Sequence, residues 1–247
     1  MTNKVLLPTI SADGMISTLN NMGAMMTTIC PYGQRWVDYA AGRKGWVLDV
    51  GCAYGATTIA AIARKAKVIA CDCFQGHLDN VKLQVPAKSR RSLRTILANF
   101  PDIDLEDGSV EAIFSGRVFH FMDDKTVERA AQEMFRLLKS DCPAIVTVDS
   151  PYLKTLTSFI PVYEARKAAG EKFPGLVEDM SLYEPDEVAA GYIPKMMHFL
   201  DPNVLTRVFK AAGFHCVTAE FFDRGSGYPS FLRRPEGKEG VALVAWK

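Results

Sequence analysis

Hydrophobic and polar positions along the chain alternate in a way that predicts strands and helices in turn. An apolar run at 46–50 ends in Gly51, residues 56–66 have helical spacing, and a second apolar run follows at 67–71. A strand, a tight turn, a helix and a second strand within about 30 residues make a βαβ unit, whose strands are parallel. The pattern therefore predicts a parallel sheet.

The alternation continues to about residue 150. Helical spacing recurs at 76–84 and at 123–139, and apolar runs at 94–98, 110–116 and 143–149 predict three more strands. The apolar side chains of the predicted helix at 123–139 fall on one face. Nearly continuous apolar strands are typical of a sheet that helices cover on both faces.

The alternation of strands and helices stops after the fifth strand and resumes at residue 201. Residues 151–200 are rich in aromatic residues, Met and Pro and show no alternation, so we interpret them as an inserted helical cap. Residues 201–213 predict a helix, because Asp201 can cap its start and Gly213 its end. The runs 214–222 and 240–246 predict the last two strands.

These elements together predict an α/β fold: a doubly wound, mostly parallel seven-stranded sheet with helices on both faces and a cap after the fifth strand. Residues 46–150 and 201–247 would form the main domain, and 151–200 the cap. Residues 1–45, which are Met-rich, predict one or two helices before the first strand.

Composition and charge narrow the class of protein. The 247 residues are 48% hydrophobic and 23% charged, as in ordinary globular proteins. A net charge of +1 gives no general attraction to nucleic acid or anionic membranes, and no apolar run is long enough to span a bilayer. The six cysteines form no CxxC pair. We therefore expect reduced thiols, no metal site, no membrane or nucleic-acid partner, and a cytoplasmic protein.

Chemistry is concentrated in the turn after the first strand. Gly51 and Gly55 lie in this turn, Asp49 stands two residues before Gly51, and Asp72 follows the second strand. The glycines allow a tight turn close to a ligand, and a carboxylate can accept hydrogen bonds from ribose hydroxyls. A dinucleotide fingerprint would have glycine where Ala53 stands, and Asp49 would repel a pyrophosphate.

The segment from Val47 to Gly55 resembles the first nucleotide-binding motif of the class I (Rossmann-like) S-adenosylmethionine-dependent methyltransferases of small-molecule type, and Asp72 resembles the acid of their second motif. The resemblance covers roughly residues 30–150 and 200–247. It implies S-adenosylmethionine as methyl donor and S-adenosylhomocysteine as product. Ala53 replaces the middle glycine common in that family, and Asn99 replaces an aspartate.

The resemblance implies that Asn99 and Phe100 face the adenine. Tyr32 stands about where the family places a side chain over the methionine part, although a packed aromatic residue explains it equally well. The full set of expected methyl-donor-binding residues is Tyr32, Asp49, Gly51, Cys52, Ala53, Gly55, Asp72, Cys73, Asn99, Phe100 and Ser115.

Methyl transfer mainly requires that two reactants are positioned and water is excluded. His120 follows the fourth strand and is the candidate general base; the alternative is a packed structural histidine. The candidate acceptor-binding residues are Phe121, Tyr192, Met197 and His198. The aromatic and Met side chains of the cap would favour a flat or apolar acceptor, or they form the core of the cap itself.

The leading hypothesis is a methyltransferase acting on a small-molecule acceptor, with the cap lying over the acceptor pocket. A protein or nucleic-acid methyltransferase is the alternative within the class, although a cap of this size favours an enclosed acceptor. A non-catalytic protein that binds the methyl donor and an NAD-dependent oxidoreductase are alternatives from other classes. The sequence leaves homodimer formation open.

Overall fold

The computed structural model describes residues 8–183 and 193–247. Its centre is a seven-stranded sheet with the strand order β10-β11-β7-β6-β3-β4-β5. The strands are β3 (Trp46–Val50), β4 (Lys67–Asp72), β5 (Leu93–Leu97), β6 (Val110–Gly116), β7 (Pro143–Asp149), β10 (His215–Phe222) and β11 (Gly240–Trp246).

Five neighbouring strands of the sheet, from β7 to β5, are parallel, and β11 is antiparallel to both β7 and β10. The mixed, mostly parallel seven-stranded sheet confirms the predicted fold class.

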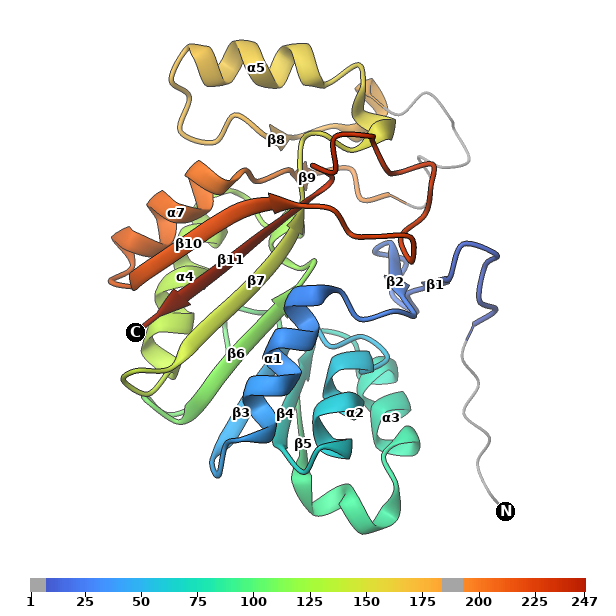
Figure 1. Ribbon diagram of the computed structural model, residues 1–247, viewed down its shortest axis with the longest axis vertical. Coiled ribbons are helices and arrows are strands. Elements are labelled where there is room, and N and C mark those ends of the chain that lie inside the picture. The colour runs from blue at the N-terminus through green and yellow to red at the C-terminus, as the bar shows by residue number, and fades with distance from the viewer. Residues whose placement is uncertain (1–7, 184–192) are drawn as a thin grey trace.

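Helices cover both faces of this sheet (Figure 1). On one face lie α1 (Pro31–Ala41), α2 (Ala56–Ala63) and α3 (Gln75–Gln84); on the other lie α4 (Asp124–Leu137) and α7 (Pro202–Ala211). Side chains along each strand alternate between two apolar cores, so that Val47 packs under α1 and α2 while Leu48 packs under α4 and α7. This burial on both faces explains why inner strands such as β7 and β11 are almost entirely apolar, whereas the edge strands β5 and β10 are partly exposed and contain polar residues.

Element ends follow local capping interactions. The Asp123 side chain accepts a hydrogen bond from Thr126 N and begins α4, and Asp201 does the same for Val204 N at the start of α7. Helix α2 ends at Ala63, earlier than the predicted residue 66, because Lys65 adopts a left-handed conformation with φ 71°.

The N-terminal region differs from the prediction. Apart from α1, its described part contains a β-hairpin, β1 (Met15–Ser17) paired with β2 (Ala24–Met26), in place of a further helix. Asn21 and Gly23, between the two strands, have φ 56° and 98°, which a right-handed helix does not allow. Residues 15–26 are called the N-terminal hairpin below.

The segment between β7 and α7 packs around its own apolar cluster. It contains α5 (Ile160–Ala168), the two-residue strands β8 (Leu176–Val177) and β9 (Met197–His198), and short 3-10 turns. In Figure 1 it lies beyond the ends of the sheet strands, on the same side as the N-terminal hairpin. The division into main domain and cap stays a prediction.

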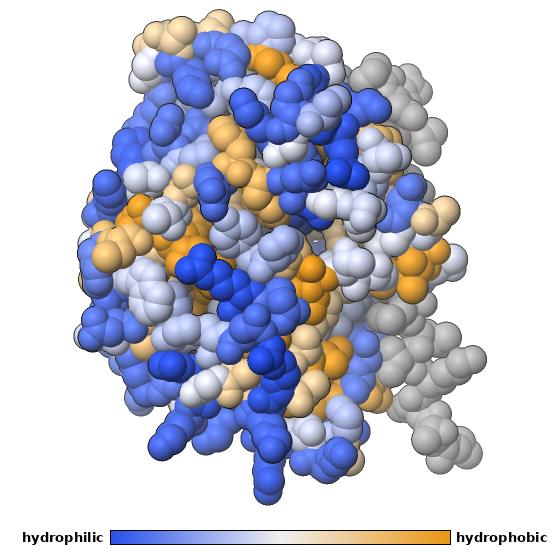
Figure 2. Space-filling model, in the orientation of Figure 1, coloured by the Kyte–Doolittle hydropathy of each residue, from blue (hydrophilic) through white to orange (hydrophobic). Residues whose placement is uncertain are grey.

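The surface facing the viewer in Figure 2 is mostly hydrophilic, with hydrophobic residues in scattered groups. Among the helices that the structure describes, none has the length and apolar character needed to cross a membrane.

Candidate active site

A cavity of about 1090 Å³ lies at the carboxyl ends of β3, β4, β6 and β7. The loops that follow these strands line one side of it. The N-terminal hairpin, residues from the 153–199 segment and the loop after β10 line the other side. Open α/β sheets bind ligands at this edge, so the cavity is the candidate active site.

The turn after β3 approaches the cavity with an unusual backbone. Gly51, Ala53 and Gly55 all have positive φ, at 66°, 44° and 78°. The left-handed region is disfavoured for alanine by roughly 1–2 kcal/mol, which gives a physical reason for the glycine common at this position. Ala53 N donates a 2.9 Å hydrogen bond to Asp72 Oδ2, and this bond ties the turn to the end of β4.

Asp49 is a buried carboxylate without a positively charged partner in the described part of the chain. Its exposed fraction is 2%, and its Oδ2 accepts hydrogen bonds from Thr57 Oγ1 at 2.8 Å and Thr58 Oγ1 at 2.6 Å. Burial raises its pKa to about 6, so the group is ionised at neutral pH. Asp49 lines the cavity. A buried negative charge of this kind favours a cationic ligand.

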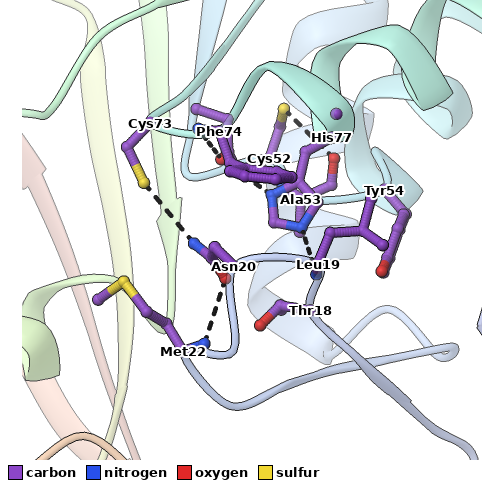
Figure 3. A network of polar contacts seen from close by, with 12 residues as sticks. Thr18, Leu19, Asn20, Met22, Cys52, Ala53, Tyr54, Cys73, Phe74 and His77 are labelled. Carbon is purple, nitrogen blue, oxygen red and sulfur yellow. Dashed lines mark hydrogen bonds and ion pairs between the residues drawn. The ribbon is translucent and has the colours of Figure 1, made fainter.

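Asp72 belongs to a chain of hydrogen bonds that reaches the N-terminal hairpin through His77. Figure 3 shows the bond between His77 and Leu19. Its Oδ1 accepts from Phe74 N at 3.0 Å and lies 2.9 Å from Nδ1 of His77. Leu19 N donates to His77 Nε2 at 3.0 Å, so the ring proton is assigned to Nδ1, which donates to Asp72. The Asp72 carboxylate is thereby fixed in orientation at the cavity wall.

Further bonds hold the hairpin against this wall. Asn20 Nδ2 contacts Cys73 Sγ at 3.7 Å, and Tyr54 OH donates to Ser17 O at 2.7 Å. On the other side Arg117 Nη1 donates to Ala24 O at 3.0 Å. The hairpin therefore closes the cavity over the ends of both β4 and β6.

Most of the residues expected to bind the methyl donor come together at this cavity. Three do not line it. Tyr32 on α1 donates a hydrogen bond to Glu220 and packs its ring edge-on to Phe222, Ser115 is fully buried within β6, and Gly55 begins α2. The lining residues from the expected set are Asp49, Gly51, Cys52, Ala53, Asp72, Cys73, Asn99 and Phe100.

Some of the residues expected to bind the acceptor or to act as the base line the cavity, and others do not. His120, Phe121 and Met197 line the cavity. His198 does not: its ring is buried with Nδ1 3.1 Å from Met122 O, and burial lowers its pKa to about 4. Tyr192 lies outside the described residues.

A group of five mostly buried polar residues occupies the end of the cavity at β6 and β7. We name it the arginine cluster: Arg117, His120, Asp149, Arg224 and Tyr228, all of which line the cavity. Asp149 accepts at Oδ1 from Arg224 Nη2 (2.9 Å) and Tyr228 OH (3.2 Å), and at Oδ2 from Arg117 Nη2 (3.2 Å). Burial alone would raise the pKa of Asp149, but the two guanidinium groups outweigh it and hold the pKa well below its usual range.

His120 lies in a 3-10 turn, Phe119–Phe121, directly after β6. Its exposed fraction is 1%, and its Nδ1 is 3.5 Å from Asp149 Oδ2 without a hydrogen bond to any described residue. Burial lowers the pKa to about 3, and the neighbouring arginines add to this effect while Asp149 opposes it. His120 is therefore a neutral imidazole at neutral pH.

Several of these residues were not among the predicted site residues. Thr57 and Thr58 could have been found as hydroxyl residues in the first helical turn after Gly55, and Arg117 stands three residues before His120, directly after the predicted fourth strand. Arg224 and Tyr228 carried no signal, because the loop after β10 reaches the cavity only through the folding of the β10–β11 pair.

Comparison with known proteins gives one family and one fold. Residues 47–141 match the family described as "Methyltransferase domain", whereas no curated protein matches the chain. An S-adenosylmethionine-dependent methyltransferase structure from Mesorhizobium loti is 15% identical, with a TM-score of 0.61 over 87% of this chain and 98% of that one.

Two archaeal methyltransferases have the same fold. The one from Archaeoglobus fulgidus is 14% identical with a TM-score of 0.57, covering 87% of this chain and 90% of its own. The one from Methanosarcina mazei is 15% identical with a TM-score of 0.59, covering 85% and 96%. Residues 47–141 are therefore a methyltransferase domain, within a chain that has the fold of the class I S-adenosylmethionine-dependent methyltransferases.

Proposed function

We propose that this protein transfers a methyl group from S-adenosylmethionine to a small-molecule acceptor. The observation that carries the proposal is one cavity with two chemically different ends. Acidic side chains and a glycine turn lie at β3 and β4, and the arginine cluster lies at β6 and β7. Ligand pockets usually measure about 300–1,000 Å³, so a volume of about 1090 Å³ suits the methyl donor together with a small acceptor.

The residues at the β3–β4 end fit the methyl donor. The Asp72 carboxylate, at the end of β4, can accept hydrogen bonds from the ribose hydroxyls. Asp49, ionised and without a cationic partner in the described part of the chain, suits the positively charged methionine portion. Asn99 and Phe100, after β5, can contact the adenine. When bound, S-adenosylmethionine supplies a methyl group activated by a positively charged sulfur.

The other end of the cavity suits a small apolar acceptor. Its lining includes Met180, Met196 and Met197 from the segment before α7 and Leu153 and Leu156 after β7. Met side chains adapt to the shape of a ligand. A protein or nucleic-acid acceptor would require a more open site.

We assign to His120 the role of receiving the acceptor's proton. It lines the cavity directly after β6, and burial keeps its imidazole uncharged. Asp149 cannot serve as the base, because two arginines stabilise its ionised form. Since a pKa near 3 makes His120 a weak base, its contribution requires an acceptor whose proton becomes acidic as the methyl group is transferred.

Calorimetric titration with S-adenosylhomocysteine tests the function directly, with NAD as the parallel ligand. We expect micromolar binding of S-adenosylhomocysteine and no binding of NAD. Binding of NAD alone would contradict the proposal. A small-molecule acceptor screen that detects released S-adenosylhomocysteine then follows, and methylation of proteins or nucleic acid alone would reject the small-molecule acceptor.

His120→Ala tests the assignment of the base. We expect kcat to fall by about 10²-fold with the first acceptor identified, while S-adenosylhomocysteine binds within about twofold of the wild-type affinity. His198→Ala is the matched control: it should lower the melting temperature but change kcat by less than about threefold, because His198 is buried away from the cavity lining. Equal rate losses in the two variants would remove His120 from the reaction.

A further inference from the structure

The arginine cluster contains more positive than negative charge. Arg117 and Arg224 share one carboxylate, Asp149. Glu239, the next buried acid, accepts from Arg224 N and lies 3.9 Å from the guanidinium of Arg233. Arg233 also pairs with Asp223 at 3.2 Å, and none of these three residues lines the cavity. The arginine cluster itself therefore has a net charge of about +1, from two guanidinium groups, one carboxylate and an uncharged His120.

The hydrogen-bonding capacity of the two guanidinium groups is only partly used. The Arg224 side chain is 4% exposed; its Nη2 donates to Val148 O and Asp149 Oδ1, but its Nε is buried without a partner among the described residues. A buried charged donor without an acceptor is unfavourable, and an anionic ligand in the cavity would supply further acceptors to the guanidinium groups. Arg117 is 24% exposed and also lines the cavity.

The surroundings of the cluster restrict the ligand further. The ring of Tyr228 lies 5.0 Å from the Arg224 guanidinium and 6.0 Å from that of Arg117. The Tyr228 ring belongs to the same apolar cluster as Leu153 and Leu156, so apolar side chains lie next to the two guanidinium groups. A single excess positive charge matches one carboxylate, and the planar guanidinium pairs well with a carboxylate.

We propose that the arginine cluster binds the carboxylate of the acceptor, so that the substrate of this enzyme is an apolar small molecule that carries one carboxylic acid group. The identification of this ligand as the acceptor rests on the proposed function. The presence of an anion site does not depend on it. The carboxylate lies against Arg117 and Arg224, and the apolar part of the acceptor lies against the Met and Leu side chains of the same cavity.

The methionine carboxylate of the methyl donor is the other possible source of the same chemistry. We favour the acceptor because all five cluster residues come from the end of β7 and from the segments after β6 and β10. His120, the assigned base, also lies 3.5 Å from the same Asp149. Asp72 and Asn99, which face the ribose and adenine, come from the opposite half of the sheet. The experiment below separates the two sources.

Titration with paired probes tests the proposal. The probes are 4-phenylbutanoate and octanoate, each compared with its neutral amide, with and without S-adenosylhomocysteine. We expect each carboxylate to bind at least tenfold more tightly than its amide. Equal affinity of acid and amide for the wild-type protein would overturn the proposal without the need for any variant.

Two variants locate the site. Arg224→Gln should reduce the preference for the carboxylate to less than about threefold, and Arg224→Lys should retain part of it, while S-adenosylhomocysteine affinity stays within about twofold. Loss of S-adenosylhomocysteine affinity with no carboxylate preference in the wild type would assign the arginines to the methyl donor and reject the proposal. Carboxylate binding without S-adenosylhomocysteine binding would instead support the anion site and reject the proposed function.

Discussion

Replacing Asp149 by alanine is expected to lower the free energy of unfolding by about 3–5 kcal/mol, because the change leaves two guanidinium groups without their counter-charge. Asp149 is 3% exposed and accepts hydrogen bonds from Arg117, Arg224 and Tyr228. Chemical denaturation at neutral pH measures the effect. Asp79→Ala is the control, since the exposed Asp79–Lys82 pair, at 3.3 Å, should contribute less than about 1 kcal/mol.

The pH dependence gives an independent check on Asp149. Its pKa is lowered on folding, so its ionised form stabilises the folded protein at every pH above the unfolded pKa of about 3.9. This contribution is lost as the pH falls below that value. The stability difference between wild type and Asp149→Asn should therefore be constant from pH 5 to 8 and shrink below pH 4. A difference that stays constant down to pH 2 would show that the arginines do not hold the carboxylate ionised.

The fold was predictable because the sheet is buried on both faces. β3, β6, β7 and β11 begin and end where the apolar runs do, since Gly, Asp or Pro marks their limits. The N-terminal hairpin was not predictable in the same way. Its Met residues suggested a helix, whereas the backbone at Asn21 and Gly23 and the bond from Leu19 N to His77 favour the hairpin. Such long-range contacts leave no periodic signal in the sequence.

The two ends of the candidate site differ in how far the sequence reveals them. Asp49 and Asp72 occupy fixed positions next to a glycine turn, so local sequence is enough to single them out. The arginine cluster is assembled from residues far apart in the chain: Arg224 reaches Asp149 only because β11 pairs with both β7 and β10. Its charge balance depends on this strand pairing, which no local pattern in the sequence indicates.

Asp49→Asn is expected to make the ligand-free protein more stable while it weakens binding of S-adenosylhomocysteine. Burial raises the pKa of Asp49 from 3.8 to about 6, so its ionised form destabilises the folded protein at neutral pH by about 2–3 kcal/mol. An asparagine oxygen can still accept from the Thr57 and Thr58 hydroxyls but carries no charge. Loss of a charged interaction with the ligand should weaken binding by about 1.5–3 kcal/mol, or roughly 10–100-fold.

The pH dependence of protein stability and of S-adenosylhomocysteine affinity separates the effect of the Asp49 charge from the effect of its shape. Because the folded pKa of Asp49 is raised, the wild-type protein loses stability relative to the variant as the pH rises from about 4 to 6, and the difference stays constant above that range. Wild-type affinity for S-adenosylhomocysteine should fall about tenfold per pH unit below pH 6, whereas the affinity of Asp49→Asn should not change. Thr57→Val, which removes one hydroxyl donor to Asp49, should move the onset of this fall to higher pH. If the wild type and Asp49→Asn had parallel pH profiles, the charge of Asp49 would play no part in binding the methyl donor.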